Sequence, residues 1–108
     1  MCDGKLAVVL FTKKMRDDNS ITDEDIGDIV NSIRSIEGVK VAVTIKQTTQ
    51  NEEKYSISSR SNCDADVSSI CAKIGGGGHT RAAGATLIAN TPEEAESTII
   101  KLFESLVI

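Results

Sequence analysis

The residues whose types could do chemistry are concentrated in one stretch, KIGGGGHTRAAGA (residues 73–85). Four glycines, ending with Gly76, Gly77 and Gly78, precede His79, which is the only histidine of the chain. Because glycine lacks a Cβ, such a run can adopt positive φ and bring amide N–H groups close to a ligand. Consecutive exposed N–H groups form a concave anion site, and an imidazolium at its edge would donate from both nitrogens. The stretch therefore indicates a phosphate-binding loop, and a plain helix cap and connector is the alternative.

Two arginines lie near this stretch in the sequence or in the expected fold. Arg60 ends the alternating segment KYSISSRS, and Arg81 follows His79 by two residues. A guanidinium can bind a phosphate through paired N–H···O bonds. We therefore add Arg60 and Arg81 to the candidate phosphate contacts. The alternative for each arginine is a solvated surface charge.

Other phosphate and metal motifs do not fit the sequence. No Gly-Lys-Ser/Thr follows the glycines, and the run comes after an expected helix, so it is not a P-loop. A dinucleotide fingerprint would need a preceding strand. The three cysteines, Cys2, Cys63 and Cys71, have no C-x-x-C spacing. With a single histidine, a zinc site is not expected, and the chain has no predicted metal ligands.

Composition limits the classes of function. The net charge is −4 and aromatic residues make up 3% of the chain. This balance argues against a basic duplex-binding face and against an aromatic base-stacking platform. The odd number of unclustered cysteines fits a reduced, cytoplasmic protein. The stretch KLAVVLFT is too short to span a bilayer, so we expect no membrane association.

The first half of the chain predicts a strand, a helix and a hairpin. The apolar run Lys5–Phe11 predicts a strand buried on both faces and hence central in a sheet. Residues 12–20 are expected to form a polar loop, with a helical turn within it as the alternative. The spacing of apolar residues predicts a helix over Thr22–Glu37, which Thr22 and Asp25 would cap. Residues 39–46 and 54–61 then alternate as an antiparallel hairpin.

The second half predicts helix, glycine loop, strand and helix. Asp66 would cap a helix that Gly75 ends, residues 84–89 would form a strand, and Thr91 and Pro92 would open the last helix. We therefore predict a single α/β (α+β) domain over 1–108. It would hold a mixed sheet of about four to five strands packed with about three helices.

The segment GGGGHTRAAGA resembles the G-G-G-G-H-x-x-A-A-G signature of the DHH-associated C-terminal domain of DHH-family phosphoesterases. The resemblance covers essentially the whole chain and points to the oligoribonuclease and phosphoadenosine-phosphate phosphatase branch. It implies a substrate-binding domain for short RNA oligomers or nucleotide phosphates. The implied contacts are Arg60, the glycines Gly76 to Gly78 and His79, whereas Arg81 occupies a variable position of the signature.

The resemblance also implies a second lobe. Family members carry an N-terminal DHH lobe whose Asp and His residues hold two manganese ions, and this chain has no Asp-His-His triplet. We therefore expect no catalytic residues here, no activity of the domain alone, and Mn²⁺ in the other lobe. A homodimer is an open alternative to a monomer. Two alternatives stay open. One is an RNA-binding accessory module like that of alanyl-tRNA synthetases, and the other is a purely structural or regulatory domain.

Overall fold

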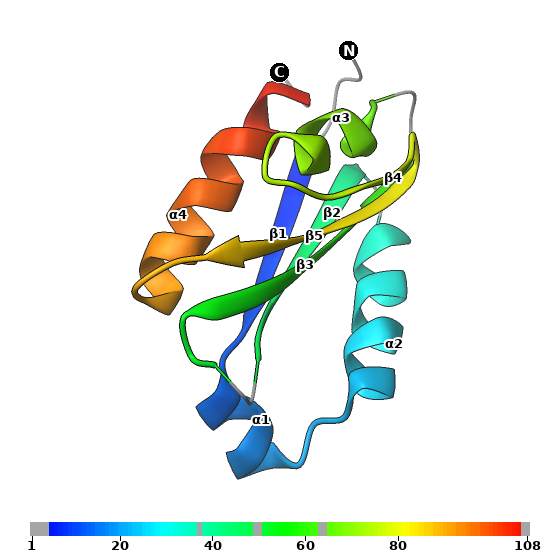
Figure 1. The fold of residues 1–108 in the computed structure, drawn as a ribbon. Helices are drawn as coiled ribbons and strands as arrows, with labels where there is room; N and C mark the ends of the chain where they lie inside the picture. The colour runs from blue at the N-terminus through cyan, green and yellow to red at the C-terminus, as the bar shows by residue number, and fades with distance from the viewer. Residues whose placement is uncertain (1–4, 37, 49–50, 63–64, 107–108) are drawn as a thin grey trace.

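A computed structural model describes residues 5–36, 38–48, 51–62 and 65–106. Five strands form one mixed sheet in the order β1-β2-β3-β5-β4 (Figure 1). Its first pair is parallel and the other pairs are antiparallel, which confirms the predicted α+β class. The strands are β1 (Lys5–Phe11), β2 (Val39–Gln47), β3 (Lys54–Ser61), β4 (Gly77–His79) and β5 (Ala82–Ile88). The helices are α1 (Lys13–Asn19), α2 (Asp23–Arg34), α3 (Val67–Ala72) and α4 (Pro92–Phe103), and a 3₁₀ turn follows at Glu104–Leu106.

The main core lies between the sheet and the layer formed by α3 and α4. It is aliphatic apart from two aromatic side chains, Tyr55 and Phe103, both fully buried. Burial of such side chains supplies most of the driving force for folding. The other fully buried apolar members include Val41, Ile45, Val67, Cys71, Ala95 and Ile99.

The opposite face of the sheet is covered only in part. Helix α2 lies on the side of the sheet away from α4 (Figure 1) and packs Ile26 and Val30 against Phe11. Its strand contacts are mainly with β2. A second, smaller core forms there, and α2 does not extend over β5 and β4. The polar side chains of those strands on this face therefore stay accessible.

The predicted capping residues at the starts and ends of the helices are present in the structure. Thr22 Oγ1 accepts from the Asp25 amide (3.1 Å), and the Asp25 carboxylate accepts from the Thr22 amide (2.9 Å), which forms a capping box. Asp66 caps α3 by accepting from the Ser68 amide (3.0 Å). Gly75 follows the end of α3 with φ of +82°, a left-handed conformation that glycine adopts without strain.

The prediction that β1 is central in the sheet is wrong, because β1 forms one edge of the described sheet. Both of its faces are nevertheless covered. Leu6 and Val8 pack against the main core, and Val9 packs against the α2 cluster. An apolar run indicates that both faces of a strand are covered. It does not indicate whether the strand has a neighbour on one side or on both.

Two segments have more regular structure than the sequence predicted. Residues 13–19 form α1, which Thr12 caps and which tertiary contacts hold: the Lys13 amide donates to Gln47 Oε1 (2.7 Å) and Arg16 Nη1 donates to the Gln47 carbonyl (3.1 Å). The end of the glycine run forms β4, because its backbone pairs with β5. Cys2 and Cys63 lie outside the described residues.

Candidate functional site

Arg60 and His79 lie in one row across the sheet. His79 is opposite Ala82 on β5, and Ala82 is opposite Arg60 on β3. Directly opposed residues of antiparallel strands point to the same face, so both side chains lie on the face that α2 leaves open. Their backbones are about 10 Å apart, which is two strand spacings. Since both side chains are long enough to reach inward, one ligand can contact both.

The neighbouring row forms a floor of nearly bare backbone. Gly77 is opposite Gly84, and Gly84 is opposite Ser58. Ala82, between His79 and Arg60, adds only a methyl group. A ligand can therefore approach the sheet closely beside the two basic side chains. The sequence predicted the basic residues and Gly77, whereas the contribution of Gly84 and Ser58 required the strand register.

The absence of a side chain has a different structural consequence at each glycine of the run. A Cβ on Gly76 would lie 2.2 Å from the Gly84 carbonyl oxygen, and one on Gly78 would lie 2.6 Å from the Ala82 carbonyl oxygen. A Cβ on Gly77 would meet no atom within 4 Å. Gly76 and Gly78 therefore allow close packing of the chain on itself, while Gly77 leaves open space on the ligand side.

The prediction that the amides of Gly76 to Gly78 bind an anion is wrong for the Gly76 amide. The Gly75 amide donates to the Ala72 carbonyl (3.2 Å), and the Gly76 amide donates to the Cys71 carbonyl (2.9 Å). These bonds end α3, so the amides cannot also bind an anion. Gly76 can therefore contribute to a ligand site only indirectly, because its missing side chain lets the loop pack closely against β5.

Arg60 is half-buried and partly held in place. Its Nη1 donates to the Ser59 carbonyl at 2.8 Å. Among the described residues, the Ser59 carbonyl is the hydrogen-bond acceptor of the Arg60 guanidinium. The guanidinium has further N–H donors. A guanidinium fixed at one corner loses little freedom when it binds a phosphate. The fold thus presents Arg60 toward the open face in a defined position.

Arg81 lies at the turn between β4 and β5, outside the Arg60–His79 row. Its carbonyl accepts from the Ser61 amide (2.9 Å), and the Thr80 carbonyl accepts from the Val67 amide (3.0 Å). These bonds fix the turn against β3 and α3. The backbone of Arg81 therefore positions His79, and the register does not bring its side chain into the row.

A groove that the sequence did not predict adjoins the row. It has a volume of about 190 Å³ and lies between α2 and the open face of β2 and β3. Ser56, Ser58 and Arg60 alternate along β3 with buried residues, and this alternation is the sequence signal that could have revealed the groove. The full lining is Ile26, Gly27, Val30, Asn31, Thr44, Lys46, Ser56, Ser58 and Arg60.

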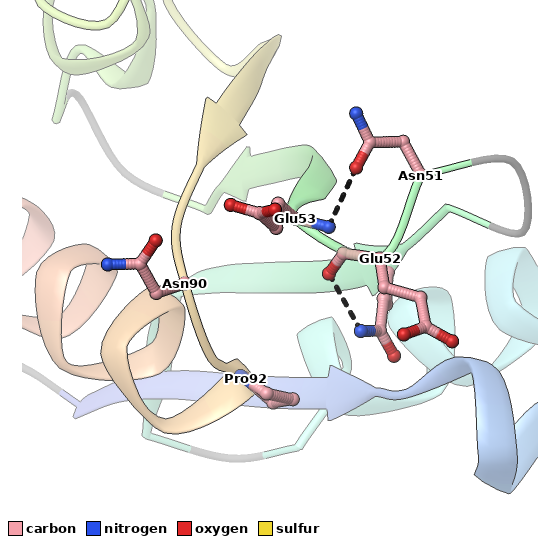
Figure 2. Close-up of a pocket in the computed structure, with 6 residues that line it drawn as sticks. Asn51, Glu52, Glu53, Asn90 and Pro92 are labelled. Carbon is pink, nitrogen blue, oxygen red and sulfur yellow. Dashed lines mark hydrogen bonds between the residues drawn. The ribbon is translucent and has the colours of Figure 1, made fainter.

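A larger depression, about 750 Å³, lies at the other end of the sheet and has a different character. Figure 2 shows Glu52, Glu53 and Asn51 on one side of it and Asn90 and Pro92 on the other. Its two carboxylates repel anions. We therefore place the candidate anion site at the Arg60–His79 row, and this wider hollow is not part of it.

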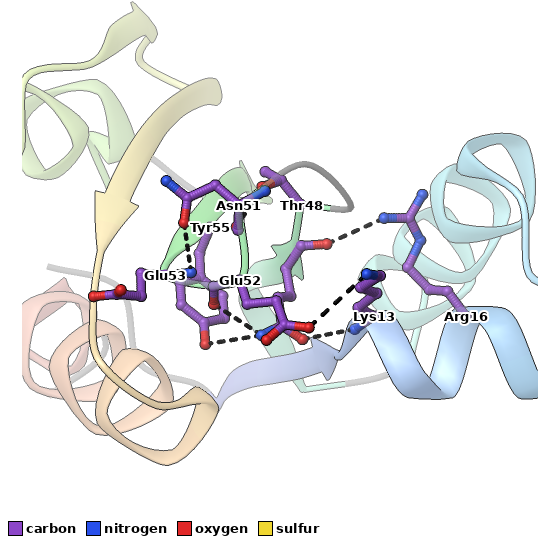
Figure 3. A network of polar contacts seen from close by, with 8 residues as sticks. Lys13, Arg16, Thr48, Asn51, Glu52, Glu53 and Tyr55 are labelled. Atoms are coloured by element: carbon purple, nitrogen blue, oxygen red, sulfur yellow. Dashed lines mark hydrogen bonds and ion pairs between the residues drawn. The ribbon is translucent and has the colours of Figure 1, made fainter.

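A polar network holds the end of the sheet beside that hollow (Figure 3). Gln47 Nε2 donates to the Glu52 carbonyl (2.8 Å) and to the Tyr55 hydroxyl (3.4 Å), and Lys13 forms an ion pair with Glu52 (3.9 Å). Burial raises the pKa of Tyr55 above its ordinary value, while the hydrogen bond from Gln47 opposes this effect. The network joins α1 to the β2–β3 connection and has a structural role.

The remaining chemistry-bearing groups are dispersed. Within 5–36, 38–48, 51–62 and 65–106, no three His, Cys, Asp or Glu side chains come together where they could hold a metal ion. Cys71 is buried, and desolvation raises the pKa of its thiol, a change that the hydrogen-bonding contact with Ser59 opposes. Among the described helices, none has the length and apolar character needed to cross a membrane.

A model of the DHHA1 domain matches residues 3–108, and this chain belongs to the DHHA1 domain family. The chain is 43% identical over 65 residues to the bifunctional oligoribonuclease and PAP phosphatase NrnA of Thermus thermophilus. That match covers 60% of this chain and 19% of the relative. The domain is thus of the type found in DHH phosphoesterases, and the chain spans a minor part of the length of this relative.

Two solved structures share the fold. An exopolyphosphatase-related protein from Bacteroides fragilis matches with a TM-score of 0.73 and 24% identity, over 94% of this chain and 28% of that chain. The C-Ala domain of Aquifex aeolicus alanyl-tRNA synthetase matches with a TM-score of 0.66 and 13% identity, over 98% of this chain and 93% of that chain. At these identities the likeness concerns the fold alone, so the fold does not separate the two types of function.

Proposed function

We propose that this chain is the substrate-binding domain of a phosphoesterase that acts on short oligoribonucleotides or nucleotide phosphates. The observation that carries the proposal is the register that aligns His79, Ala82 and Arg60 on the open face. Arg60 and His79 would hold a terminal phosphate, and the bare backbone at Gly77 would let the ligand approach the sheet. The similarity to an oligoribonuclease and PAP phosphatase supports this substrate class.

Hydrolysis would take place outside this chain. The described residues offer no cluster of carboxylates and imidazoles for a metal pair, and a two-metal site needs several such ligands. We infer that a DHH lobe supplies Mn²⁺ and faces the open side of the sheet. This chain would contribute by fixing the phosphate, because holding a substrate in position can account for a large part of catalysis.

A second candidate function is RNA binding as an accessory module. The C-Ala domain of an alanyl-tRNA synthetase shares the fold over 98% of this chain, so the fold is compatible with such a function. The net charge of −4 and the 3% content of aromatic residues disfavour a long RNA contact. The two functions differ in the size of the preferred ligand, so a binding assay can separate them.

The test is calorimetric titration of the 108-residue chain with a nucleoside 3′,5′-bisphosphate, a 5′-phosphorylated diribonucleotide and tRNA. Arg60→Gln and His79→Gln should each weaken binding of the small ligands about 10- to 100-fold, because a charged hydrogen bond contributes roughly 1.5–3 kcal/mol. Lys101→Gln on α4 is the control for lost charge. Tighter binding of tRNA than of the small ligands, or equal affinity of all variants, would contradict the proposal.

A further inference from the structure

The groove between α2 and the sheet continues beyond Arg60, and phosphate contacts at Arg60 and His79 leave its far end unused. Arg60 lines one end, and Lys46 and Ser56, which are register partners, line the other. Ser56 is four residues from Arg60 along β3, a separation of about 13 Å at the rise of an extended strand. A phosphate and its sugar alone are shorter than this length, so a ligand held at Arg60 reaches the far end through its base or through a second, linked nucleotide.

The lining suits phosphate and sugar oxygens. Thr44, Ser56 and Ser58 supply hydroxyl groups, Asn31 supplies an amide, and Lys46 supplies an ammonium. These groups can all donate hydrogen bonds to an oxygen-rich ligand. No described lining residue carries a carboxylate, although the chain as a whole has a net charge of −4. The groove is therefore a place on this acidic domain where an anion meets no nearby repulsion from its walls.

Gly27 supplies an independent observation. It lies inside α2, where glycine is a poorer helix former than alanine. A Cβ at this position would meet no atom within 4 Å, so packing within the described chain does not explain the missing side chain. Gly27 lines the groove. An interior helix glycine with no internal packing reason is consistent with close approach of a molecule from outside.

We propose that this groove is a second subsite, which binds the following nucleotide units of an oligomer whose terminal phosphate lies at Arg60 and His79. The inference rests on the proposed function for the Arg60–His79 row. It adds that the domain senses ligand length: a mononucleotide bisphosphate contacts only the row, and a trinucleotide also contacts Lys46 and Ser56.

The experiment compares two ligands on the 108-residue chain, a nucleoside 3′,5′-bisphosphate and a 5′-phosphorylated triribonucleotide. Lys46→Gln should weaken the trinucleotide about tenfold, because it removes one charged contact, and should leave the bisphosphate within about twofold. Gly27→Leu should have the same selective effect by filling the groove. Its thermal midpoint should stay equal or rise, because leucine is the better helix former. Lys101→Gln on α4 should change neither affinity.

The outcomes separate this inference from the proposed function. If Lys46→Gln and Gly27→Leu leave both affinities unchanged, or lower both equally, the subsite is disproved. In that case the proposed function still stands when Arg60→Gln weakens both ligands. If the unmodified chain binds neither ligand, both proposals fail.

Discussion

The two faces of β3 differ completely in character. Tyr55, Ile57 and Ser59 point toward α3 and α4 and are at most 1% exposed. Ser56 and Ser58 point to the opposite face and line the groove beside α2. Because successive residues of a strand point to opposite sides, one backbone carries a core on one face and a candidate ligand surface on the other. Substitutions one residue apart should therefore act on different properties.

The difference arises from how the helices are distributed. Helices α3 and α4 together close the main core, whereas α2 packs alone over Phe11 and the strands beside it. None of the described helices covers the strand pair β5–β4 on that side, and its small residues Gly77, Ala82 and Gly84 leave the backbone accessible. Incomplete cover costs buried apolar area and leaves a flat polar surface free for a ligand.

The largest expected effect comes from the buried face of β3. Ile57→Ala should lower the free energy of unfolding by about 2–5 kcal/mol, because it leaves a cavity in the main core. Ser58→Ala, one residue away on the open face, should change it by no more than about 0.5 kcal/mol. Urea denaturation of the two variants measures both values. Equal losses would show that the two faces do not divide stability and binding as proposed.

The same contrast exists between adjacent glycines. Gly76→Ala places a Cβ 2.2 Å from the Gly84 carbonyl oxygen, and the resulting shift of β5 or of the end of α3 should cost about 1–3 kcal/mol. Gly77→Ala meets open space, so stability should change by less than about 0.5 kcal/mol, while the added methyl group should weaken ligand binding. Thermal unfolding and calorimetric titration test the pair. A stable Gly76→Ala variant would mean that this contact is not tight.

The smallest expected effect concerns the cap that positions the glycine run through α3. The hydrogen bond from the Ser68 hydroxyl is the largest cause that lowers the pKa of Asp66. Burial opposes it, and the Ser69 and Ser68 amides add smaller lowering effects. A lowered pKa in the folded state stabilises the fold above the ordinary value and loses this contribution below about pH 4.

Asp66→Asn keeps an oxygen acceptor at the cap but cannot titrate. The free energy of unfolding of the native chain should fall more steeply than that of Asp66→Asn between about pH 4 and the lowered pKa of Asp66. Denaturation series at several pH values measure the two slopes. Identical slopes would mean that the Asp66 carboxylate does not stabilise the helix start.

The amino-acid sequence by itself determined the local features of this domain. The caps at Thr22 and Asp66, the helix stop at Gly75 and the alternation of β3 depend on residues a few positions apart, and the sequence displays such residues directly. It also marked His79 and Arg60 as candidates, since their types and the glycine run are visible in one dimension.

Only the tertiary structure decided which strands are neighbours. Strand pairing joined Arg60 to His79 through Ala82 and placed β1 at an edge of the sheet. It also opened the groove at Lys46 and Gly27. Each of these results depends on hydrogen bonds and packing between segments far apart in the chain, and no local pattern specifies which segments will meet.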